Sequence, residues 1–374
     1  MKIAILTIHW ANSYGGSLQS LATQEVLSRY GDVKIIDYKT KHLEKTMWLV
    51  RFGTRPRDIL RMGKDLFRLP SRHKLLKNFK LFFQSNYKLT KKICSDNDLQ
   101  GLNEEFDVFV CGSDQIWNPN ILESFDLNYY LKFVKDDRKK IAYASSKGSY
   151  IYNKEEEGKI ISELERFNAI GVREIDTKNY LDEKLSNKKI EHVLDPTLLL
   201  DKNEWLSLLN IQNKEFCEPY LFVYTLKKDS FVRNLIKKIS SKLNLKVVVI
   251  DQDPILGFHA DEHIRGASPK DFVDLIFNAS FVLTNSFHGT AFAANFEKPF
   301  LSIRPETGTN RIKDFLLKIG ESNRLVDEKS IIEESLLSTG RINCYQLNEL
   351  RVESFQYLES EFGVSSSCID FNYK

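Results

Sequence analysis

The sequence predicts an α/β protein made of two Rossmann-like units, each a parallel sheet with helices between its strands. Short apolar runs alternate with stretches of helical periodicity along almost the whole chain, and this alternation is typical of βαβ units. The alternation forms two successive series, which meet near Asp195-Pro196, where an apolar run stops at a proline. The length of 374 residues, 42% of them hydrophobic, is ample for two cores.

The expected elements follow this alternation in order. In the first series the apolar runs that we interpret as strands cover 3–8, 33–37, 106–111, 140–144, 169–172 and 191–194. In the second series they cover 220–225, 246–250, 281–284 and 300–303. Helical periodicity covers 17–29, 154–167, 230–243, 269–278, 311–319 and 347–362. We therefore predict a first domain over 1–195, a second over 196–345, and a C-terminal segment, 346–374, whose helix packs back on the first domain.

The composition excludes several classes of protein. Charged residues make up 28% of the chain, which is typical of a folded protein. No apolar run is long enough to cross a bilayer, and the apolar start lacks the cleavage site of a signal peptide. The five cysteines are widely spaced and form no CxxC motif, which disfavours both disulfides and a zinc site. His259 and His263 lack HExxH order, which also disfavours a metal site. We therefore expect a cytoplasmic protein without a metal site.

Positive charge is concentrated between residues 41 and 92. This segment holds fifteen Lys or Arg against three acidic residues, a net charge of +12, whereas the whole chain carries only +3. Arg57, Arg61, Lys64 and Arg68 recur at helical spacing, with apolar and aromatic residues between them. Two interpretations stay open: an amphipathic insertion that contacts the inner face of an anionic membrane, or an ordinary helical insertion whose apolar side joins the core. Nucleic acid is disfavoured because no nucleic-acid-binding motif accompanies the charge.

Chemistry is expected in the loops that follow strands, because open α/β sheets bind ligands at the carboxyl ends of their strands. The loop after the first strand holds Asn12, Tyr14 and Gly15, before a helix expected to begin at Ser17. Paired glycines allow a close approach of the backbone to a ligand, and a helix N-terminus favours an anion. The loop has neither GxGxxG nor Walker order, so a glycine turn needed only for packing is an equal alternative.

The loop that begins at Gly112 is denser in polar groups. Ser113, Asp114 and Gln115 suit the hydroxyls of a sugar, and Trp117 suits stacking on its apolar face. The alternative is an Asp-capped turn with a buried tryptophan. We favour the sugar site, because a turn alone does not require so much polar chemistry.

Two further loops supply groups that bind anions or move protons. Arg173 follows a strand, and its guanidinium suits a carboxylate or a phosphate, although a surface pair with Glu174 is the simpler alternative. His288 falls at the start of a helix, beside Gly289, where free backbone N–H groups bind an anion. A histidine in such a place is a candidate acid or base.

Several motifs follow one another in an order and spacing that together are specific. They are the early loop with Asn12 and its paired glycines, Gly-Ser-Asp-Gln-Ile-Trp-Asn from Gly112, Tyr-Ala-Ser-Ser from Tyr143, Val-Arg-Glu from Val172, Asp-Pro-Thr from Asp195, Ser-Phe-His-Gly-Thr from Ser286, Lys-Pro-Phe from Lys298, and Asn-Arg-Ile from Asn310. In these motifs the chain resembles the polysaccharide pyruvyl transferases over nearly its whole length. The match is poorest over 41–92.

The resemblance implies a GT-B-like fold, with two Rossmann-like domains facing a central cleft. It implies transfer of the pyruvyl group of phosphoenolpyruvate to two hydroxyls of a sugar in a surface polysaccharide or its lipid-linked precursor, as a ketal, without metal or organic cofactor. His288 and Arg173 would be the catalytic residues. With the chemistry of the loops, we assign the donor to Ser286, Phe287, Gly289, Thr290 and Arg311, and the acceptor to Asn12, Tyr14, Gly15, Ser113, Asp114, Gln115 and Trp117.

Two other functions compete with this one. A GT-B glycosyltransferase that uses a nucleotide sugar would have a similar fold. Asp251 or Glu306 would be its candidates for binding ribose, but no clear motif supports either. A carbohydrate-binding protein without catalysis would keep the cleft, but the presence of both Arg173 and His288 argues against it.

Overall fold

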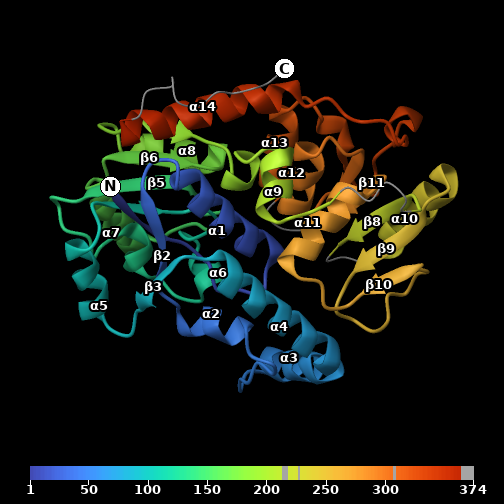
Figure 1. Ribbon diagram of the computed structural model, residues 1–374, viewed down its shortest axis with the longest axis horizontal. Coiled ribbons are helices and arrows are strands. Elements are labelled where there is room, and N and C mark those ends of the chain that lie inside the picture. The colour runs from blue at the N-terminus through green and yellow to red at the C-terminus, as the bar shows by residue number, and fades with distance from the viewer. Residues whose placement is uncertain (213–217, 226–227, 306–308, 364–374) are drawn as a thin grey trace.

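The computed structural model of the protein describes residues 1–212, 218–225, 228–305 and 309–363. Its strands form two sheets, and every pair of neighbouring strands runs parallel. Figure 1 shows the first sheet with its helices in the left half of the molecule and the second sheet in the right half. We call each sheet with its helices a unit. Glu306 and the end of the predicted C-terminal segment, 364–374, lie outside the described residues.

The first sheet has seven strands in the order β3-β2-β1-β4-β5-β6-β7. Its inner strands are almost purely apolar, as expected of parallel strands covered on both faces. The strands are β1 (Lys2–Leu6), β2 (Asp32–Asp37), β3 (Leu89–Lys92), β4 (Val108–Cys111), β5 (Lys139–Ser145), β6 (Ala169–Val172) and β7 (Ile190–His192).

The second sheet has six strands in the order β10-β9-β8-β11-β12-β13. The strands are β8 (Tyr220–Tyr224), β9 (Lys246–Ile250), β10 (Glu262–Ile264), β11 (Phe281–Thr284), β12 (Phe300–Ile303) and β13 (Leu325–Val326). The predicted strands are all present, with ends shifted by a few residues. β3, β10 and β13 were not predicted, because these edge strands are short and two of them are largely polar.

Helices connect the strands throughout both units. They are α1 (Tyr14–Leu27), α2 (Lys41–Thr46), α3 (Pro56–Phe67), α4 (Leu69–Asn86), α5 (Asp96–Gly101), α6 (Pro119–Leu122), α7 (Lys154–Leu164), α8 (Ile175–Lys184), α9 (Lys202–Leu208), α10 (Ser230–Leu243), α11 (Pro269–Asn278), α12 (Phe287–Asn295), α13 (Thr309–Lys318) and α14 (Tyr345–Phe362). Short 3₁₀ turns lie at Leu102–Glu104, Leu127–Tyr130, Pro196–Leu198, Ser322–Arg324 and Glu334–Leu336. In the described ranges, none of the helices combines the length and the apolar character that a bilayer span needs.

Helix α1 begins earlier than the sequence predicted. The hydroxyl of Ser13 accepts a hydrogen bond from the backbone N–H of Gly16, which caps the helix, so the first residue of α1 is Tyr14 and not Ser17. The paired glycines therefore belong to the first turn of α1 and do not form a loop. This places Gly15 on a helix end that faces the second unit.

The two units share a buried apolar cluster. It runs from Ile5 of β1 through Leu18 of α1 and Phe79 of α4 to Phe272 of α11. In Figure 1, α14 extends along one side of both units. The hydroxyl of Tyr357 on this helix donates to a carbonyl of β5 at 2.9 Å, and the helix also bonds to α12 at 2.6 Å. The proposed domain bounds stay a prediction.

The basic segment 41–92 forms α2, α3, α4 and β3. Its second long helix, α4, buries Phe79 and Phe83, which pack on Tyr14 and Trp10 with ring centroids 5.2 Å and 5.1 Å apart. This part of the segment therefore joins the core, as one of the two interpretations expected. Helix α3 does not, and its residues Ile59, Leu60, Leu66 and Phe67 are exposed.

Candidate active site

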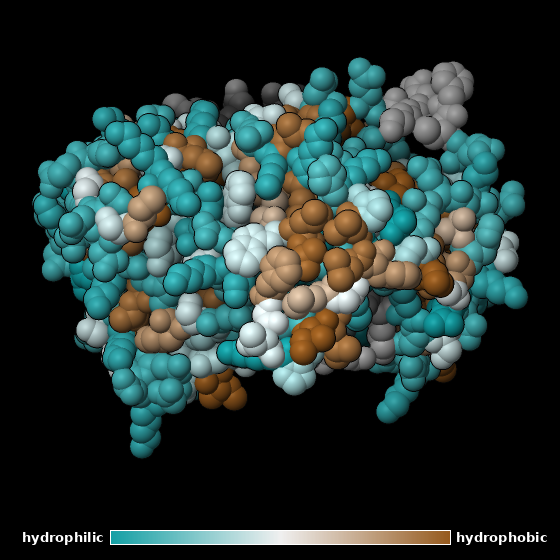
Figure 2. Space-filling model, turned by 90° about the horizontal axis from the view of Figure 1, so that it is seen from below, coloured by the Kyte–Doolittle hydropathy of each residue, from teal (hydrophilic) through white to brown (hydrophobic). Residues whose placement is uncertain are grey.

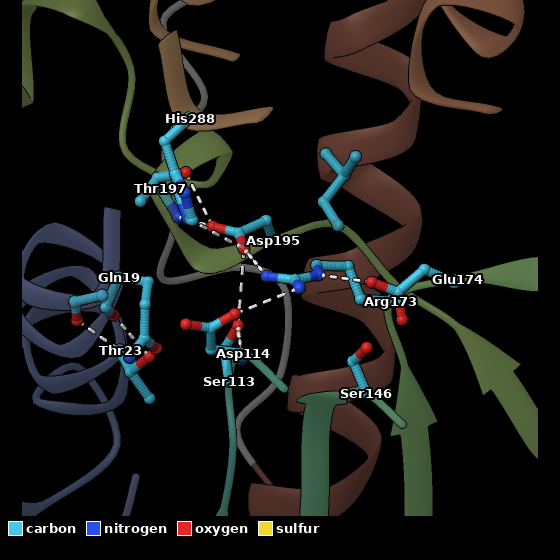
Figure 3. A network of polar contacts seen from close by, with 12 residues as sticks. Gln19, Thr23, Ser113, Asp114, Ser146, Arg173, Glu174, Asp195, Thr197 and His288 are labelled. Carbon is cyan, nitrogen blue, oxygen red and sulfur yellow. Dashed lines mark hydrogen bonds and ion pairs between the residues drawn. The ribbon is translucent and has the colours of Figure 1, made fainter. Parts of the chain in front are cut away.

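The polar side chains of the site stand at the carboxyl ends of strands from both sheets. β4 leads into Asp114, β6 leads into Arg173, and Asp195 comes shortly after β7. From the second sheet, β11 leads into His288 on α12. Figure 3 shows these four side chains pointing toward one another. The junction of the two sheets thus gathers acids, an arginine and a histidine, as ligand sites of open α/β sheets do.

The turn after β4 depends on a glycine. Gly112 has a φ of +117°, which lies in the region that side chains rarely adopt. A Cβ atom at this position would lie 2.0 Å from the carbonyl oxygen of Tyr143. The turn buries Ser113 completely and brings Asp114 to within 3.2 Å of Arg173. A side chain at Gly112 would therefore displace the acid that follows it.

Arg173 is the centre of an ion-pair network (Figure 3). It is 6% exposed, and its three nitrogens donate to three carboxylates: Nε to Glu174 at 2.9 Å, Nη1 to Asp195 at 2.7 Å and Nη2 to Asp114 at 3.2 Å. Burial alone would lower the pKa of Arg173, but these carboxylates raise it above its usual value. The predicted pairing with Glu174 exists, although it is buried and not on the surface. The network indicates that Arg173 positions the acids around it.

Asp195 is the most enclosed acid of the network. Its Oδ1 accepts from the backbone N–H and the hydroxyl of Thr197, at 3.0 Å and 2.7 Å, and its Oδ2 accepts from Arg173. Burial alone would raise the pKa of Asp195, but contacts with His288, Arg173 and Thr197 hold it well below the usual range. The side chain is therefore an anion in the folded protein.

His288 belongs to the second unit, and its side chain faces the carboxylate of Asp195. It is the second residue of α12, so the prediction of a histidine at a helix N-terminus is confirmed. Its Nε2 faces Oδ2 of Asp195 at 3.6 Å and, among the residues that the structure describes, makes no hydrogen bond. On its other side the ring abuts Gly15, where a Cβ atom would lie 2.0 Å from Nδ1. A histidine in this position is a candidate to act as an acid or a base.

A second arginine, Arg311 on α13, completes the positive charge. The guanidinium carbons of Arg311 and Arg173 lie 6.0 Å and 5.2 Å from the centre of the Phe287 ring. Burial and the nearby charge of Arg173 lower the pKa of Arg311. When the Gln115 amide is oriented with its oxygen toward Arg311, that oxygen accepts at 3.1 Å and 3.2 Å. No carboxylate of the described residues forms an ion pair with Arg311, so this cation is available to an anionic ligand.

A pocket lies beside this network, between the two units. Arg173, Glu174 and Asp195 line it from the first unit, and Phe287 and Arg311 line it from the second. Residues of helix α14 also line this pocket. The pocket therefore combines charged groups from both units with the aromatic ring of Phe287.

Two residues predicted to bind the acceptor lie in the core instead. Trp117 is 2% exposed, stacks on Tyr130 with centroids 5.4 Å apart, and donates its Nε1–H to the carbonyl of Tyr129. Tyr14 is 8% exposed and stacks on Phe272 of the second unit at 4.9 Å. Their aromatic faces are already covered, so the expectation that they hold a sugar is corrected. The alternative of a turn with a buried tryptophan holds for Trp117.

The other predicted acceptor residues are closer to the network. Those that the structure brings to Arg173, Asp195, His288 or Arg311 are Gly15, Ser113, Asp114 and Gln115. Asn12 lies in the loop before α1 and is partly exposed. Asp114 and Gln115 are also partly exposed, so they remain candidates for contact with a ligand.

Three of the residues assigned to the donor shape the start of α12. The hydroxyl of Ser286 caps the helix by accepting from the backbone N–H of Gly289 at 3.4 Å. Thr290 is fully buried, with its hydroxyl 2.7 Å from that of Ser302, and a Cβ atom on Gly289 would lie 2.5 Å from Oγ1 of Thr284. The side chain of Thr290 faces the core and the α-carbon of Gly289 packs on β11, and contact of their backbone with the donor stays a prediction.

Sequence reasoning did not assign Glu174 and Asp195 to the site. A signal for both was present, because each follows a predicted strand of the first series, as Arg173 does. Parallel strands end at one edge of a sheet, so charged residues directly after them meet there. The rule that predicts Arg173 at this edge applies equally to its two acidic partners.

The residues considered for other ligands are engaged elsewhere. Oδ2 of Asp251 pairs with the ammonium of Lys228 at 2.8 Å. His263 belongs to β10, where its Nε2 lies 3.2 Å from the carbonyl oxygen of Asp251. In the part of the chain that the structure describes, no three His, Cys, Asp or Glu side chains are grouped so that they could hold a metal ion.

The family of the chain follows from a comparison with family models. The model of the polysaccharide pyruvyl transferases matches residues 14–307, which is more than half of the chain and includes the loops of the network. The chain belongs to the polysaccharide pyruvyl transferase family. The resemblance noted from the motifs is therefore confirmed, and the family is one of transferases. No curated protein matches the chain.

Solved structures show the fold of this pyruvyl transferase family member. It is similar to a putative UDP-N-acetylglucosamine 2-epimerase from Listeria monocytogenes, with 12% identity, a TM-score of 0.55 and 97% of each chain covered. It is also similar to S. aureus MnaA in a co-structure with UDP, with 11% identity, a TM-score of 0.52 and 97% of each chain covered. Identity this low shows the fold alone. The predicted GT-B-like arrangement of two parallel sheets is confirmed.

Proposed function

We propose that this chain transfers the pyruvyl group of phosphoenolpyruvate to two hydroxyls of a sugar, in a surface polysaccharide or its lipid-linked precursor, and forms a ketal. One observation carries the proposal. His288 of the second unit stands 3.6 Å from the buried carboxylate of Asp195 in the first, and Arg311 lies in the adjoining pocket. An acid or base beside a cation suits a reaction that moves protons on a small anion.

The reaction needs one proton added to carbon, one proton removed from each of two hydroxyls, and the loss of phosphate. A proton adds to the methylene carbon of phosphoenolpyruvate and makes C2 electrophilic. One sugar hydroxyl attacks C2 and loses its proton, and the bond between C2 and the phosphate oxygen breaks. The second hydroxyl then attacks C2, loses its proton to the departing phosphate, and closes the ketal. Atoms and charge balance without an oxidant, and the chemistry requires an acid, a base and an anion cradle but no metal.

The roles of the residues follow from their surroundings. His288 is the group that moves protons, and the carboxylate of Asp195 lies 3.6 Å from its Nε2. Arg311 binds the carboxylate or phosphate of the donor, because no carboxylate of the described residues pairs with it. Arg173, which already bonds to three carboxylates, positions these groups. We thus revise the catalytic assignment of Arg173 to a positioning one.

The acceptor would approach from the first unit. Asp114 lies next to Arg173 and is partly exposed, and burial that would raise its pKa is outweighed by Arg173, His288 and Arg311, which lower the pKa of Asp114. Its carboxylate is therefore ready to accept hydrogen bonds from sugar hydroxyls. Gln115 lies beside it and presents a side-chain amide, which also suits hydroxyls.

The test uses the purified full chain with phosphoenolpyruvate and a panel of sugars that carry neighbouring hydroxyls. We expect release of inorganic phosphate that depends on the sugar, and a new methyl signal of the ketal in the proton NMR spectrum. Thermal stabilisation by phosphoenolpyruvate alone gives a first readout that needs no acceptor. Stabilisation by a nucleotide sugar, without any effect of phosphoenolpyruvate, would contradict the proposal in favour of a glycosyltransferase.

A further inference from the structure

One surface of the molecule gathers exposed apolar side chains. We call it the α3 surface, and its residues are Trp48, Leu49, Phe52, Ile59, Leu60, Leu66, Phe67 and Leu69. These are eight of the seventeen large hydrophobic side chains exposed among the described residues, and all lie within 48–69. Figure 2 views the molecule from the side where α2, α3 and α4 lie in Figure 1, and apolar residues gather at its centre among polar ones. Single exposed hydrophobics are normal, but a cluster of this kind marks an interaction site.

Helix α3 is attached to the protein by charge and not by apolar packing. Of its twelve residues, all of them described, Asp65 is the one that is buried. The Asp65 carboxylate accepts from Nε and Nη2 of Arg51, at 2.9 Å and 2.6 Å, and lies 3.7 Å from Arg72. Leu60 and Phe67 remain 73% and 61% exposed. The apolar residues of α3 therefore contribute little to the core of this chain.

Basic groups surround the α3 surface. The segment 41–92 that contains it carries a net charge of +12, and Arg55, Arg57 and Lys64 are exposed on or beside α3. A pocket next to Phe52 is lined by basic side chains, namely His42, Lys45, Arg51, Arg55 and Arg61, together with Asp58 and Glu123. The surface thus combines apolar side chains with groups that pair with phosphate.

We propose that the α3 surface binds the anionic face of a lipid bilayer. The apolar side chains of α3 enter the head-group region, and the surrounding Lys and Arg side chains contact lipid phosphates. Charge complementarity selects this partner, because an apolar patch alone would serve a protein partner equally well. A second copy of the chain is disfavoured, since two segments of +12 repel each other when they face.

The α3 surface is fixed relative to the cleft between the units. Helix α4 follows α3 directly, and its Phe79 packs on Tyr14 at the start of α1. Arg68, between the two helices, pairs with Asp253 of the second unit. The amide of Asn78 on α4 donates to a carbonyl of the second unit at 2.7 Å. Docking would therefore hold the cleft in one orientation relative to the membrane, which suits a lipid-linked acceptor. This consequence alone rests on the proposed function.

The test is co-sedimentation of the full chain with vesicles, in the absence of any substrate. Vesicles of phosphatidylcholine in which about a third of the lipid is phosphatidylglycerol provide the anionic surface, and pure phosphatidylcholine vesicles provide the neutral one. We expect binding to the anionic vesicles at least about tenfold tighter than to the neutral ones, and a fall in binding as salt is raised. Equal binding to both, or none to either, would overturn the proposal.

Matched variants assign the binding to this surface. Leu60→Ser with Phe67→Ser removes apolar side chains, and Arg57→Glu with Lys64→Glu reverses charge. Each pair should weaken binding by about tenfold or more, with unchanged thermal stability, because all four side chains are exposed.

The controls make the same changes away from the α3 surface. They are Ile151→Ser with Ile331→Ser, which are 87% and 95% exposed, and Lys237→Glu with Lys238→Glu on α10. We expect both controls to bind like the native chain. An equal loss in variants and controls would overturn the assignment. So would a native dimer, seen by size-exclusion chromatography with light scattering, that Leu60→Ser with Phe67→Ser converts to a monomer.

Discussion

The imidazole of His288 and the carboxylate of Asp195 meet across the two units, with Nε2 and Oδ2 3.6 Å apart. The histidine belongs to α12, which follows a strand of the second sheet, and the acid follows the last strand of the first. Neither unit alone therefore contains the pair. The proposed proton transfer would therefore depend on how the two units pack.

Replacement of His288 by glutamine should abolish most of the proposed activity without changing the fold. Glutamine keeps hydrogen-bonding groups at this place but neither takes up nor releases a proton at neutral pH. We expect kcat for phosphate release from phosphoenolpyruvate to fall by about 10²- to 10⁴-fold, with an unchanged circular dichroism spectrum. His259→Gln is the control, because the His259 side chain is 81% exposed. A His288→Gln variant with native turnover would show that another group moves the protons.

The two arginines of the pocket should respond differently to replacement. Arg173→Met leaves three carboxylates around an uncharged side chain, so we expect the free energy of unfolding in urea to fall by about 3 to 5 kcal/mol. Arg311→Met breaks no carboxylate pair among the described residues, so its loss of stability should be much smaller. The KM for phosphoenolpyruvate should instead rise by about tenfold or more, because a charge-assisted bond to the donor is lost.

Arg173→Lys provides the second measurement if Arg173→Met does not fold. Lysine keeps the charge but lacks the fork that reaches three carboxylates, so a partial recovery of stability is expected. Equal losses of stability in Arg173→Met and Arg311→Met would contradict the division of roles between the two residues.

Gly15 should be required for the contact between α1 and His288. A methyl group there would lie 2.0 Å from Nδ1 of the imidazole, a distance that forces the ring or the helix to move. We expect Gly15→Ala to lower kcat by about 10²-fold, because a displacement of about 1 Å is enough for such a loss. Gly16→Ala is the matched control, since its Cβ atom would meet Ser13 at an ordinary 3.4 Å. Equal activity of the two alanine variants would refute the close-contact argument.

The part of the fold that was predictable from sequence is the part that local pattern determines. The inner strands are short apolar runs with a turn signal after each, and His288 follows such a run at a capped helix start, so its place was predictable. The edge strands β3 and β10 are largely polar, and each forms by hydrogen bonding to the strand beside it in the sheet. Their own sequences give no apolar pattern to recognise.

The sequence predicted which loops form the site, but not how their side chains pair. Arg173 lies at the expected sheet edge, but its role depends on Asp114 and Asp195, which come from other loops. Gly15 was predicted as a ligand-binding glycine, and the group it approaches is a side chain of the second unit. Trp117 could not be assigned from its neighbours, because whether it faces a sugar or Tyr130 depends on tertiary packing.

The stability of the protein should fall in acid, and Asp195 should account for a measurable share. The pKa of Asp195 is lowered in the folded state, so its contribution is fully present above the pKa of an unfolded aspartate, about 3.9, and is lost as the pH falls below that value. In Asp195→Asn this contribution is absent at every pH. The variant should therefore be less stable at pH 7 by about 1 to 3 kcal/mol, with a smaller loss of stability on acidification. Urea unfolding from about pH 7 to pH 3 measures both quantities.

Asp137→Asn is the control at an exposed position and should follow the native curve. If Asp195→Asn loses as much stability in acid as the native chain does, the ion pairs of Asp195 do not stabilise the fold.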